Sequence, residues 1–509
     1  MSQSRIVIVG GGPGGYEAAL VAAQLGARVT VIEDNGLGGA CVLADCVPSK
    51  TLIATSSMMA ALEGTPDLGI RFNSTATPAP AAARVPATTP ARAASPVPAA
   101  EPAPAAEPAP ASATPAAAQA AQADQHPAHA WADAPKIYSR IRRLAQAQSA
   151  DVAARLAVEG VDVISGTGRL LGPGLVAIGD REIEADTILI ATGARPRELE
   201  DAIPDGERLL TSRQIYDLDE LPEELIVVGS GVTGAEFASA FCALGSQVTL
   251  VSSREHVLPN EDTDAAMVVE DVFRRRGMRV LSRSRARSAR RTKDGVEVTL
   301  ANGDRVHGSH CLLTVGMVPL TEGIGLDQAK VEVDERGFVA VDRVSRTSVP
   351  GVYAAGDCTG VLMLASVAAM QGRIAMWHAL GEAVHPLRLS HVAATIFTEP
   401  EIATVGVSQE QVDSGKVKAK VVKMPLATNA RAKMDGFSDG FVKLFARPNS
   451  GAVLGGVIVA PRASDLILSV SLAVERQITV DEVAQTFAVY PSLTGSITEA
   501  ARRLMEPTE

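Results

Sequence analysis

The chain contains one pattern twice, and this repeat limits its fold more than any other feature. "IVIVGGGPGGYEAALVAAQLGARVTVIE" near the N-terminus recurs as "LIVVGSGVTGAEFASAFCALGSQVTLVS" from Leu225. Each copy has the pattern of an apolar strand, a glycine-rich turn, an alanine-rich helix and a second apolar strand. Such strand–helix–strand units build parallel sheets, so the sequence predicts an α/β fold with two domains of this kind.

Both glycine turns have the spacing G-x-G-x-x-G that is typical of a dinucleotide-binding site. The glycines in question are Gly10, Gly12, Gly15, Gly229, Gly231 and Gly234. Glycine allows a tight turn and a close approach of the backbone, so that a pyrophosphate can lie at the helix N-terminus. Two units predict two nucleotides bound at once, although a glycine turn that serves the fold alone stays open as the alternative.

The residue at the end of the second strand distinguishes the two units. Glu33 ends the first unit, and a carboxylate there accepts hydrogen bonds from a ribose diol. The equivalent position is Ser252, followed by Ser253 and Arg254. With hydroxyls and a guanidinium instead of a repelling carboxylate, the second site is predicted to accept the 2′-phosphate of NADPH. NADH use, and a solvated surface role for Arg254, stay open.

Composition changes mark the domains. From about Ser74 the chain is mostly Ala and Pro, which predicts a disordered or polyproline-like loop. After Pro386, alternating strands and helices indicate a separate α+β domain. We expect a first nucleotide domain at 1–72 and 136–215, completed by 331–385, an insertion at 74–135, a second nucleotide domain at 216–330, and the α+β domain at 386–509.

Charge and cysteine content exclude several function classes. A net charge of −11 argues against a nucleic-acid partner. No apolar stretch reaches the ~20 residues that a transmembrane segment needs, and no secretion signal precedes "RIVIVG". Five cysteines in 509 residues do not make a disulfide framework. We therefore expect a cytoplasmic protein without a metal site, in which any disulfide is catalytic.

The motifs "GGGPGG", "GGACVLADCVPSK", "ATGARPR", "GSGVTGAE" and "AAGDC" together resemble those of the flavoprotein disulfide reductases, such as lipoamide dehydrogenase and glutathione reductase. The resemblance implies two Rossmann-like domains, the first for FAD and the second for NADPH and/or NADH, and a homodimer built by a C-terminal dimerisation domain. It implies that Glu33 holds the FAD ribose and that Asp357, just past a strand end, holds the ribityl chain. The further cofactor-binding residues that it implies are Thr192, Gly193, Gly316, Gly356 and Ala365.

The stretch "GGACVLADCVPSK" contains a pair of cysteines, Cys41 and Cys46. The resemblance implies that Cys46 faces the flavin, that Cys41 exchanges with substrate, and that Lys50 pairs with Glu236 near the flavin. Cys46 lies at the start of a helix, where the helix dipole and Lys50 lower a thiol pKa. The alternative is two free buried thiols.

The C-terminus departs from the family. Disulfide exchange there uses a His-Pro-x-x-x-Glu proton shuttle, but Tyr490 precedes Pro491 here and Gly495 replaces the glutamate. Glu499 comes one helical turn late, and a tyrosine with a pKa near 10 is a poor base at neutral pH.

A closer resemblance, carried by "GSGVTGAEF", "ASVAAMQGRIAM" and "YPSLTGSITEAARRLM", is to the lipoamide-dehydrogenase-like NAD(P)H–quinone dehydrogenases. It implies hydride transfer from NAD(P)H through flavin to a small quinone, with Tyr490 or water as the proton source. Two alternatives stay open. One is a dihydrolipoyl dehydrogenase-like disulfide reductase that uses Cys41 and Cys46. The other is a non-catalytic interaction role for the Ala/Pro segment.

Overall fold

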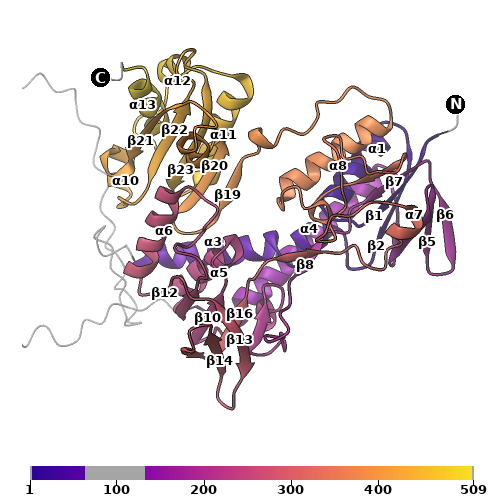
Figure 1. Ribbon diagram of the computed structural model, residues 1–509, viewed down its shortest axis with the longest axis horizontal. Helices are drawn as coiled ribbons and strands as arrows, with labels where there is room; N and C mark the ends of the chain where they lie inside the picture. The colour runs from indigo at the N-terminus through magenta and orange to yellow at the C-terminus, as the bar shows by residue number, and fades with distance from the viewer. Residues whose placement is uncertain (1–2, 64–131, 507–509) are drawn as a thin grey trace, which may run out of the picture. The chain divides into compact units, whose positions relative to one another are not determined.

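The computed structural model describes residues 3–63 and 132–506 (Figure 1). Most of the insertion predicted at 74–135 therefore lies outside the described residues. The last residues of the predicted insertion are described, and α4 (Ala134–Val158) starts among them at Ala134. The side chain of Asp133 caps this helix by accepting a hydrogen bond of 3.1 Å from the backbone N–H of Lys136.

The first parallel sheet has the strand order β18-β7-β1-β2-β3. Its strands are β1 (Arg5–Val9), β2 (Arg28–Glu33), β3 (Asp162–Ser165), β7 (Thr187–Ile190) and β18 (Val352–Ala354). Helix α1 (Pro13–Gln24) connects β1 to β2 and lies beside α8 (Ala365–Ala379) (Figure 1). Glycine permits this close packing, since a Cβ on Gly372 of α8 would lie 2.1 Å from the carbonyl oxygen of Gly14.

The second parallel sheet has the order β12-β11-β10-β16-β9. Its strands are β9 (Leu209–Thr211), β10 (Glu224–Val228), β11 (Gln247–Val251), β12 (Arg279–Leu281) and β16 (His310–Leu313), and α5 (Val232–Ala243) connects β10 to β11. Strand β9 falls in the range 136–215 that was expected to belong to the first domain. All three of its residues are buried by pairing with β16 at the sheet edge.

The C-terminal sheet is antiparallel, with the order β19-β20-β23-β22-β21. Its elements are β19 (Ala394–Ile396), β20 (Glu401–Gly406), β21 (Lys420–Pro425), β22 (Phe441–Ala446), β23 (Val453–Ala460), α11 (Ala463–Arg476), α12 (Val480–Gln485) and α13 (Gly495–Leu504). Every residue of β22 is buried, so this central strand is covered on both faces. The α+β domain predicted from the change in pattern after Pro386 is therefore present.

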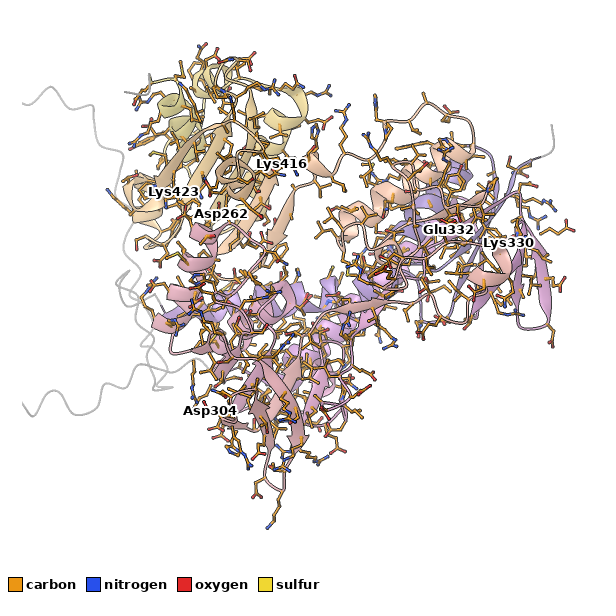
Figure 2. The ribbon with its side chains drawn as sticks, viewed as in Figure 1. Asp262, Asp304, Lys330, Glu332, Lys416 and Lys423 are labelled. Atoms are coloured by element: carbon orange, nitrogen blue, oxygen red, sulfur yellow. The ribbon has the colours of Figure 1, made fainter. Side chains whose placement is uncertain are left out.

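Salt bridges attach the C-terminal domain to helix α6 (Thr263–Arg275) of the second nucleotide domain. Lys443 of β22 is buried, and its ammonium lies 2.7 Å from carboxylate oxygens of both Asp262 and Asp264. Lys423 of β21 reaches Asp264 at 2.9 Å, and Figure 2 labels Lys423 and Asp262 at this junction. A buried ion pair costs several kcal/mol to break, so this junction is held firmly.

The remaining elements are short apart from α3 (Cys46–Glu63), which packs against α4 and α5. The other helices are α2 (Gly39–Leu43), α7 (Leu326–Ala329), α9 (Gln409–Asp413) and α10 (Ala430–Met434). The antiparallel strands are β4 (Gly168–Gly172), β5 (Leu175–Ile178), β6 (Arg181–Glu184), β8 (Ala194–Pro196), β13 (Ala286–Arg291), β14 (Val296–Leu300), β15 (Arg305–Gly308) and β17 (Met317–Pro319). No helix in the described ranges combines the length and the apolar character needed to cross a bilayer.

Candidate functional site

A cavity of about 730 Å³ lies at the carboxyl ends of the first sheet. Its wall contains ten of the residues predicted from the sequence: Gly10, Gly12, Glu33, Cys41, Cys46, Thr192, Gly193, Gly356, Asp357 and Ala365. Ligands of open α/β sheets bind at this end of the strands, and the volume is in the range of cofactor sites. The structure therefore brings the first glycine turn, the cysteine pair and the strand-end motifs to one site.

In the first glycine turn, two glycines are required by the packing of the fold, and the one between them faces open space. Gly10 has a φ of +107°, and a Cβ on it would lie 2.2 Å from the carbonyl oxygen of Ala191. A Cβ on Gly15 would lie 1.9 Å from the carbonyl oxygen of Gly10. Gly12, in contrast, faces open space within 4 Å. The outer glycines are thus required by packing, whereas Gly12 leaves the space into which a pyrophosphate fits.

The second glycine turn repeats this geometry. A Cβ on Gly229 would lie 2.3 Å from the carbonyl oxygen of Thr314, and one on Gly234 would lie 1.9 Å from that of Gly229. Gly231 and Gly316 face open space. The second unit therefore also has a turn whose middle glycine is free to approach a nucleotide.

The backbone holds Glu33 in place at the end of β2. Its carboxylate accepts hydrogen bonds from the N–H of Gly11 at 2.6 Å and from the N–H of Asn35 at 2.7 Å. These bonds fix the carboxylate on the cavity wall beside the glycine turn.

Ser252, at the end of β11, points into the protein. It is fully buried, with its hydroxyl oxygen 2.7 Å from that of Ser230, and it accepts a hydrogen bond of 3.1 Å from the N–H of Arg254. Of the three residues for which a phosphate contact was predicted, Ser252 is buried, whereas Ser253 and Arg254 are exposed. The N–H of Arg283 donates to the Arg254 carbonyl at 2.7 Å, so a second exposed arginine follows the same edge. The arginine-rich stretch "SRSRARSARR" was the signal for it.

The cysteine pair is in the free thiol form. Cys41 lies in α2, and Cys46 is the first residue of α3. A hydrogen bond between the thiols lowers the pKa of Cys46, against the effect of burial, while the same bond and burial raise the pKa of Cys41. When the reduced pair loses a proton, Cys46 therefore loses it first and Cys41 keeps its own.

Lys50 and Glu236 form an ion pair at 2.8 Å between α3 and α5. The carboxylate of Glu236 also accepts a hydrogen bond of 2.9 Å from the N–H of Phe397, and Lys50 lies 4.8 Å from the centre of the Phe397 ring. Burial lowers the pKa of Lys50, but the charge and hydrogen bond of Glu236 outweigh it and the net shift is upward. Lys50 thus keeps its charge beside the redox pair.

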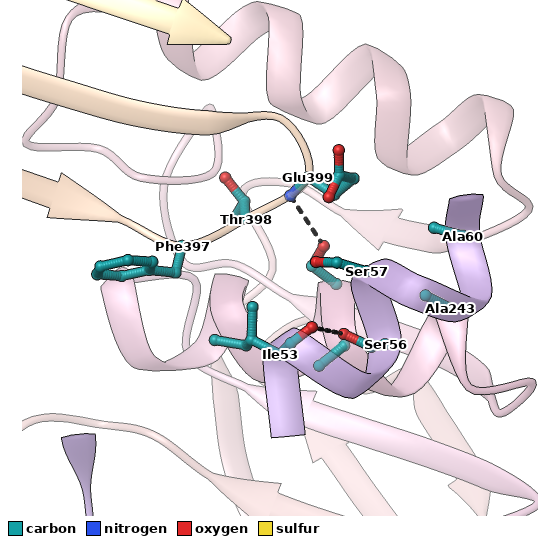
Figure 3. A pocket seen from close by; sticks show the side chains of 10 residues that line it. Ile53, Ser56, Ser57, Ala60, Ala243, Phe397, Thr398 and Glu399 are labelled. Carbon is teal, nitrogen blue, oxygen red and sulfur yellow. Dashed lines mark hydrogen bonds between the residues drawn. The ribbon is translucent and has the colours of Figure 1, made fainter. Parts of the chain in front are cut away.

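A second, smaller cavity lies where α3, α5 and residues 397–399 meet (Figure 3). Its volume is about 10 Å³, and the N–H of Glu399 donates to the Ser239 hydroxyl at 3.3 Å beside it. A space of this size holds one water at most. It is therefore excluded as a substrate site.

Five charged residues that line the large cavity were not among the sequence predictions: Asp34, Asp45, Arg195, Arg213 and Glu322. Burial raises the pKa of Asp357 to about 6, with a further increase from the charge of Asp45 and an opposing effect of Arg213. The guanidinium of Arg213 donates to the Ala194 carbonyl at 2.6 Å. The position of Asp45 directly before Cys46 was a usable signal, whereas the sequence around Arg213 carried none.

The C-terminal candidates lie away from this cavity in the protomer. Tyr490 is 85% exposed and lies between α12 and α13, and Gly495 begins α13. Glu499 is bound by Arg502 at 2.8 Å and Arg503 at 3.2 Å, and the hydrogen bond from Arg502 lowers its pKa to about 2. Glu499 is therefore not available to orient a base. The part of the chain that the structure describes contains no cluster of three metal-ligating side chains.

Two protein-family models match the chain, and together they cover the domains that form this site. The model of the pyridine nucleotide-disulphide oxidoreductases matches residues 4–372, and that of their dimerisation domain matches residues 392–501. The chain belongs to the pyridine nucleotide-disulphide oxidoreductase family. This confirms the predicted α/β fold with two nucleotide-binding domains and a dimerisation domain.

The similar proteins differ in their activities. An NAD(P)H dehydrogenase (quinone) of Mycobacterium tuberculosis is 51% identical, over 99% of this chain and 94% of that protein. A dihydrolipoyl dehydrogenase of Zymomonas mobilis is 30% identical, over 97% of this chain and 96% of that one. The crystal structure of LpdA from Mycobacterium tuberculosis has a TM-score of 0.84 at 50% identity and covers 99% of this chain and 100% of its own.

Proposed function

We propose that the chain is an FAD-dependent NAD(P)H:quinone oxidoreductase. The observation that carries this proposal is a complete nucleotide site combined with a C-terminus that has no base for disulfide exchange. Tyr490 and Gly495 stand where the family shuttle has histidine and glutamate, and Glu499 is held by two arginines. The 51% identical relative, an NAD(P)H dehydrogenase (quinone), supports it.

The cavity residues fit FAD. Gly12 leaves space for the pyrophosphate, Glu33 presents a carboxylate to the adenosine ribose, and Asp357 lies where a ribityl hydroxyl would accept or donate a hydrogen bond. When bound, FAD would supply the two-electron chemistry that connects NAD(P)H to the acceptor. The Lys50–Glu236 pair keeps a positive charge near this site.

For the acceptor, we assign Tyr490 the role of hydrogen-bond donor to a quinone oxygen, in a homodimer built by the dimerisation domain. Its exposed phenol is free to contact a second subunit. A quinone takes up two electrons and two protons, so a donor at its oxygen suffices and no strong base is needed. Disulfide exchange, in contrast, needs a base that deprotonates a thiol.

For the donor, we propose NADPH as the preferred nucleotide, with NADH as a slower substrate. Arg254 follows β11, Arg283 follows the neighbouring strand β12, and both arginines are exposed. The position equivalent to Glu33 is Ser252, so the carboxylate of the first unit has no counterpart there. Glu255 offsets part of this positive charge, because it forms an ion pair with Arg283. Charge-assisted hydrogen bonds from guanidinium groups to phosphate are the strong kind.

The test is steady-state NADPH oxidation by the purified flavoprotein with benzoquinone or with oxidised lipoamide. We expect fast turnover with the quinone and a rate at least about a hundredfold lower with lipoamide, because general acid–base catalysis is commonly worth 10²–10⁴-fold. Brisk lipoamide reduction with an inert quinone would overturn the proposal.

A second candidate is a disulfide reductase that uses Cys41 and Cys46. It is favoured by one observation: the pKa values of the two thiols are shifted in opposite directions, so that Cys46 ionises first, and exchange chemistry requires a thiolate. Replacing Cys41 by Ser separates the candidates. Quinone turnover that survives in the variant supports the quinone route, whereas loss of all turnover supports the disulfide route.

A further inference from the structure

Asp45 is a carboxylate placed between the two redox cysteines. It directly precedes Cys46, in the turn between the end of α2 and the start of α3. Asp45, Cys41 and Cys46 line the same cavity. The short turn therefore keeps the Asp45 carboxylate on the same cavity wall as both thiols. In such a partly buried site, charges interact more strongly than in water.

The charges around the pair do not cancel this carboxylate. Asp45 raises the pKa of both thiols, and on Cys46 its effect exceeds the opposite effect of Lys50. Glu236 and Asp357 add negative charge from α5 and from the turn after β18, and Arg213 adds positive charge. Tyr216, which packs nearby, stays neutral because burial raises its pKa. Asp45 therefore opposes the thiolate form of Cys46, which the hydrogen bond from Cys41 and the charge of Lys50 favour.

We propose that Asp45 makes the Cys41–Cys46 disulfide harder to reduce and thereby leaves electrons on the bound cofactor for a quinone. Reduction breaks the S–S bond, takes up two electrons and one proton, and gives a Cys46 thiolate and a Cys41 thiol. Under the proposed function, the hydride of NAD(P)H supplies both the two electrons and the one proton, so the reaction balances without a further proton. A fixed carboxylate destabilises the thiolate product but not the uncharged disulfide.

With Asp45 beside it in the chain, the cysteine pair can be present in a quinone reductase without taking the electrons. In an enzyme of this family that reduces disulfides, electrons must leave the cofactor for the sulfur atoms. Here Asp45 opposes that transfer, so that the pair competes less with the quinone. The transfer of the electrons to a quinone rests on the proposed function. The effect of Asp45 on the reduction of the disulfide does not.

The experiment measures the thiol–disulfide equilibrium of the holoenzyme without quinone or NADPH. Wild type, Asp45→Asn, Asp45→Glu and Asp34→Asn are equilibrated anaerobically in mixtures of reduced and oxidised dithiothreitol at pH 8.5 and pH 5. The thiols are then trapped with iodoacetamide and counted by mass spectrometry. Asp34 is the matched control, because it lies on the wall of the same cavity and its carboxylate accepts a hydrogen bond of 3.2 Å from Thr167.

At pH 8.5 we expect Asp45→Asn to be half reduced at a three- to tenfold lower ratio of reduced to oxidised dithiothreitol, roughly half to one pKa unit. The shift is smaller at pH 5, because more of the reduced pair is then fully protonated. Asp45→Glu and Asp34→Asn stay near wild type. No shift in Asp45→Asn, an equal shift at both pH values, or the same shift in Asp45→Glu would overturn the proposal. Failure of quinone turnover would leave this result unaffected and count only against the proposed function.

Discussion

The two strand–helix–strand units have nearly the same backbone but different side chains where a nucleotide would be recognised. The clash distance for the third glycine is 1.9 Å in both, and the first glycines have φ values of +107° and +111°. At the end of the second strand, however, Glu33 presents a carboxylate to the cavity, whereas Ser252 turns its hydroxyl inward to Ser230. The fold thus fixes the turn twice, and the differences between the two units lie in a few side chains beyond it.

The largest effect is expected where both units are alike. A Cβ at Gly15 or Gly234 would overlap a backbone carbonyl oxygen that has no room to move. Gly15→Ala and Gly234→Ala are therefore expected to cost roughly 3 kcal/mol or more and to reduce the yield of folded protein sharply. The measurement is soluble yield and the thermal unfolding midpoint. Normal stability of either variant would contradict the packing argument.

Substitution of the middle glycine is expected to have a different effect in each of the two units. Gly12 and Gly231 face open space, so alanine at either position is compatible with the fold. We expect Gly12→Ala to fold but to lose bound flavin, and Gly231→Ala to keep its flavin while its KM for NADPH rises about tenfold. The absorbance ratio of flavin to protein and steady-state kinetics test this pair. If both variants lost flavin equally, the two turns would not serve different nucleotides.

The sequence was sufficient for features that depend on spacing, and insufficient for those that depend on distant contacts. Both glycine turns and the placement of Cys46 at a helix start follow from local patterns. The inward rotation of Ser252 depends on Ser230 of the neighbouring turn, and the position of Arg213 depends on the carbonyl of Ala194. No local pattern encodes such contacts, because they form only when separate segments pack together.

The next effect in size is expected for Arg254, at the edge of the second unit. Removing one guanidinium from a phosphate is expected to cost about 1.5–3 kcal/mol, so Arg254→Gln is expected to raise the KM for NADPH about tenfold or more. The KM for NADH should stay within about twofold. Arg276→Gln, at an exposed helix end, is the matched control. An equal change for both nucleotides would mean that Arg254 does not contact the 2′-phosphate.

The smallest expected effect is on the pH dependence of stability, and it follows from a comparison of two acidic residues, Glu236 and Asp357. Glu236 is paired with Lys50, whereas Asp357 has no salt bridge within 3–63 and 132–506, and burial raises its pKa to about 6. An unfolded aspartate titrates near 3.9, so between about pH 4 and pH 6 folded Asp357 binds more protons than the unfolded chain. The stability that protonated Asp357 provides is therefore lost as pH rises through this window, at most about 3 kcal/mol.

Asp357→Asn removes the titrating group, so the unfolding midpoint of the flavin-free variant is expected to stay flatter between pH 4 and pH 7 than that of wild type. Asp357→Glu keeps the carboxylate and should keep the slope. The measurement is thermal unfolding across this pH range after removal of the flavin. If Asp357→Asn retained the wild-type slope, the pH dependence would belong to another group. If the unfolding midpoint of Asp357→Asn instead did not change with pH, the ionised carboxylate of Asp357 would be the group that destabilises the flavin-free protein. A hydroxyl chain bound there would stabilise that charge by a hydrogen bond.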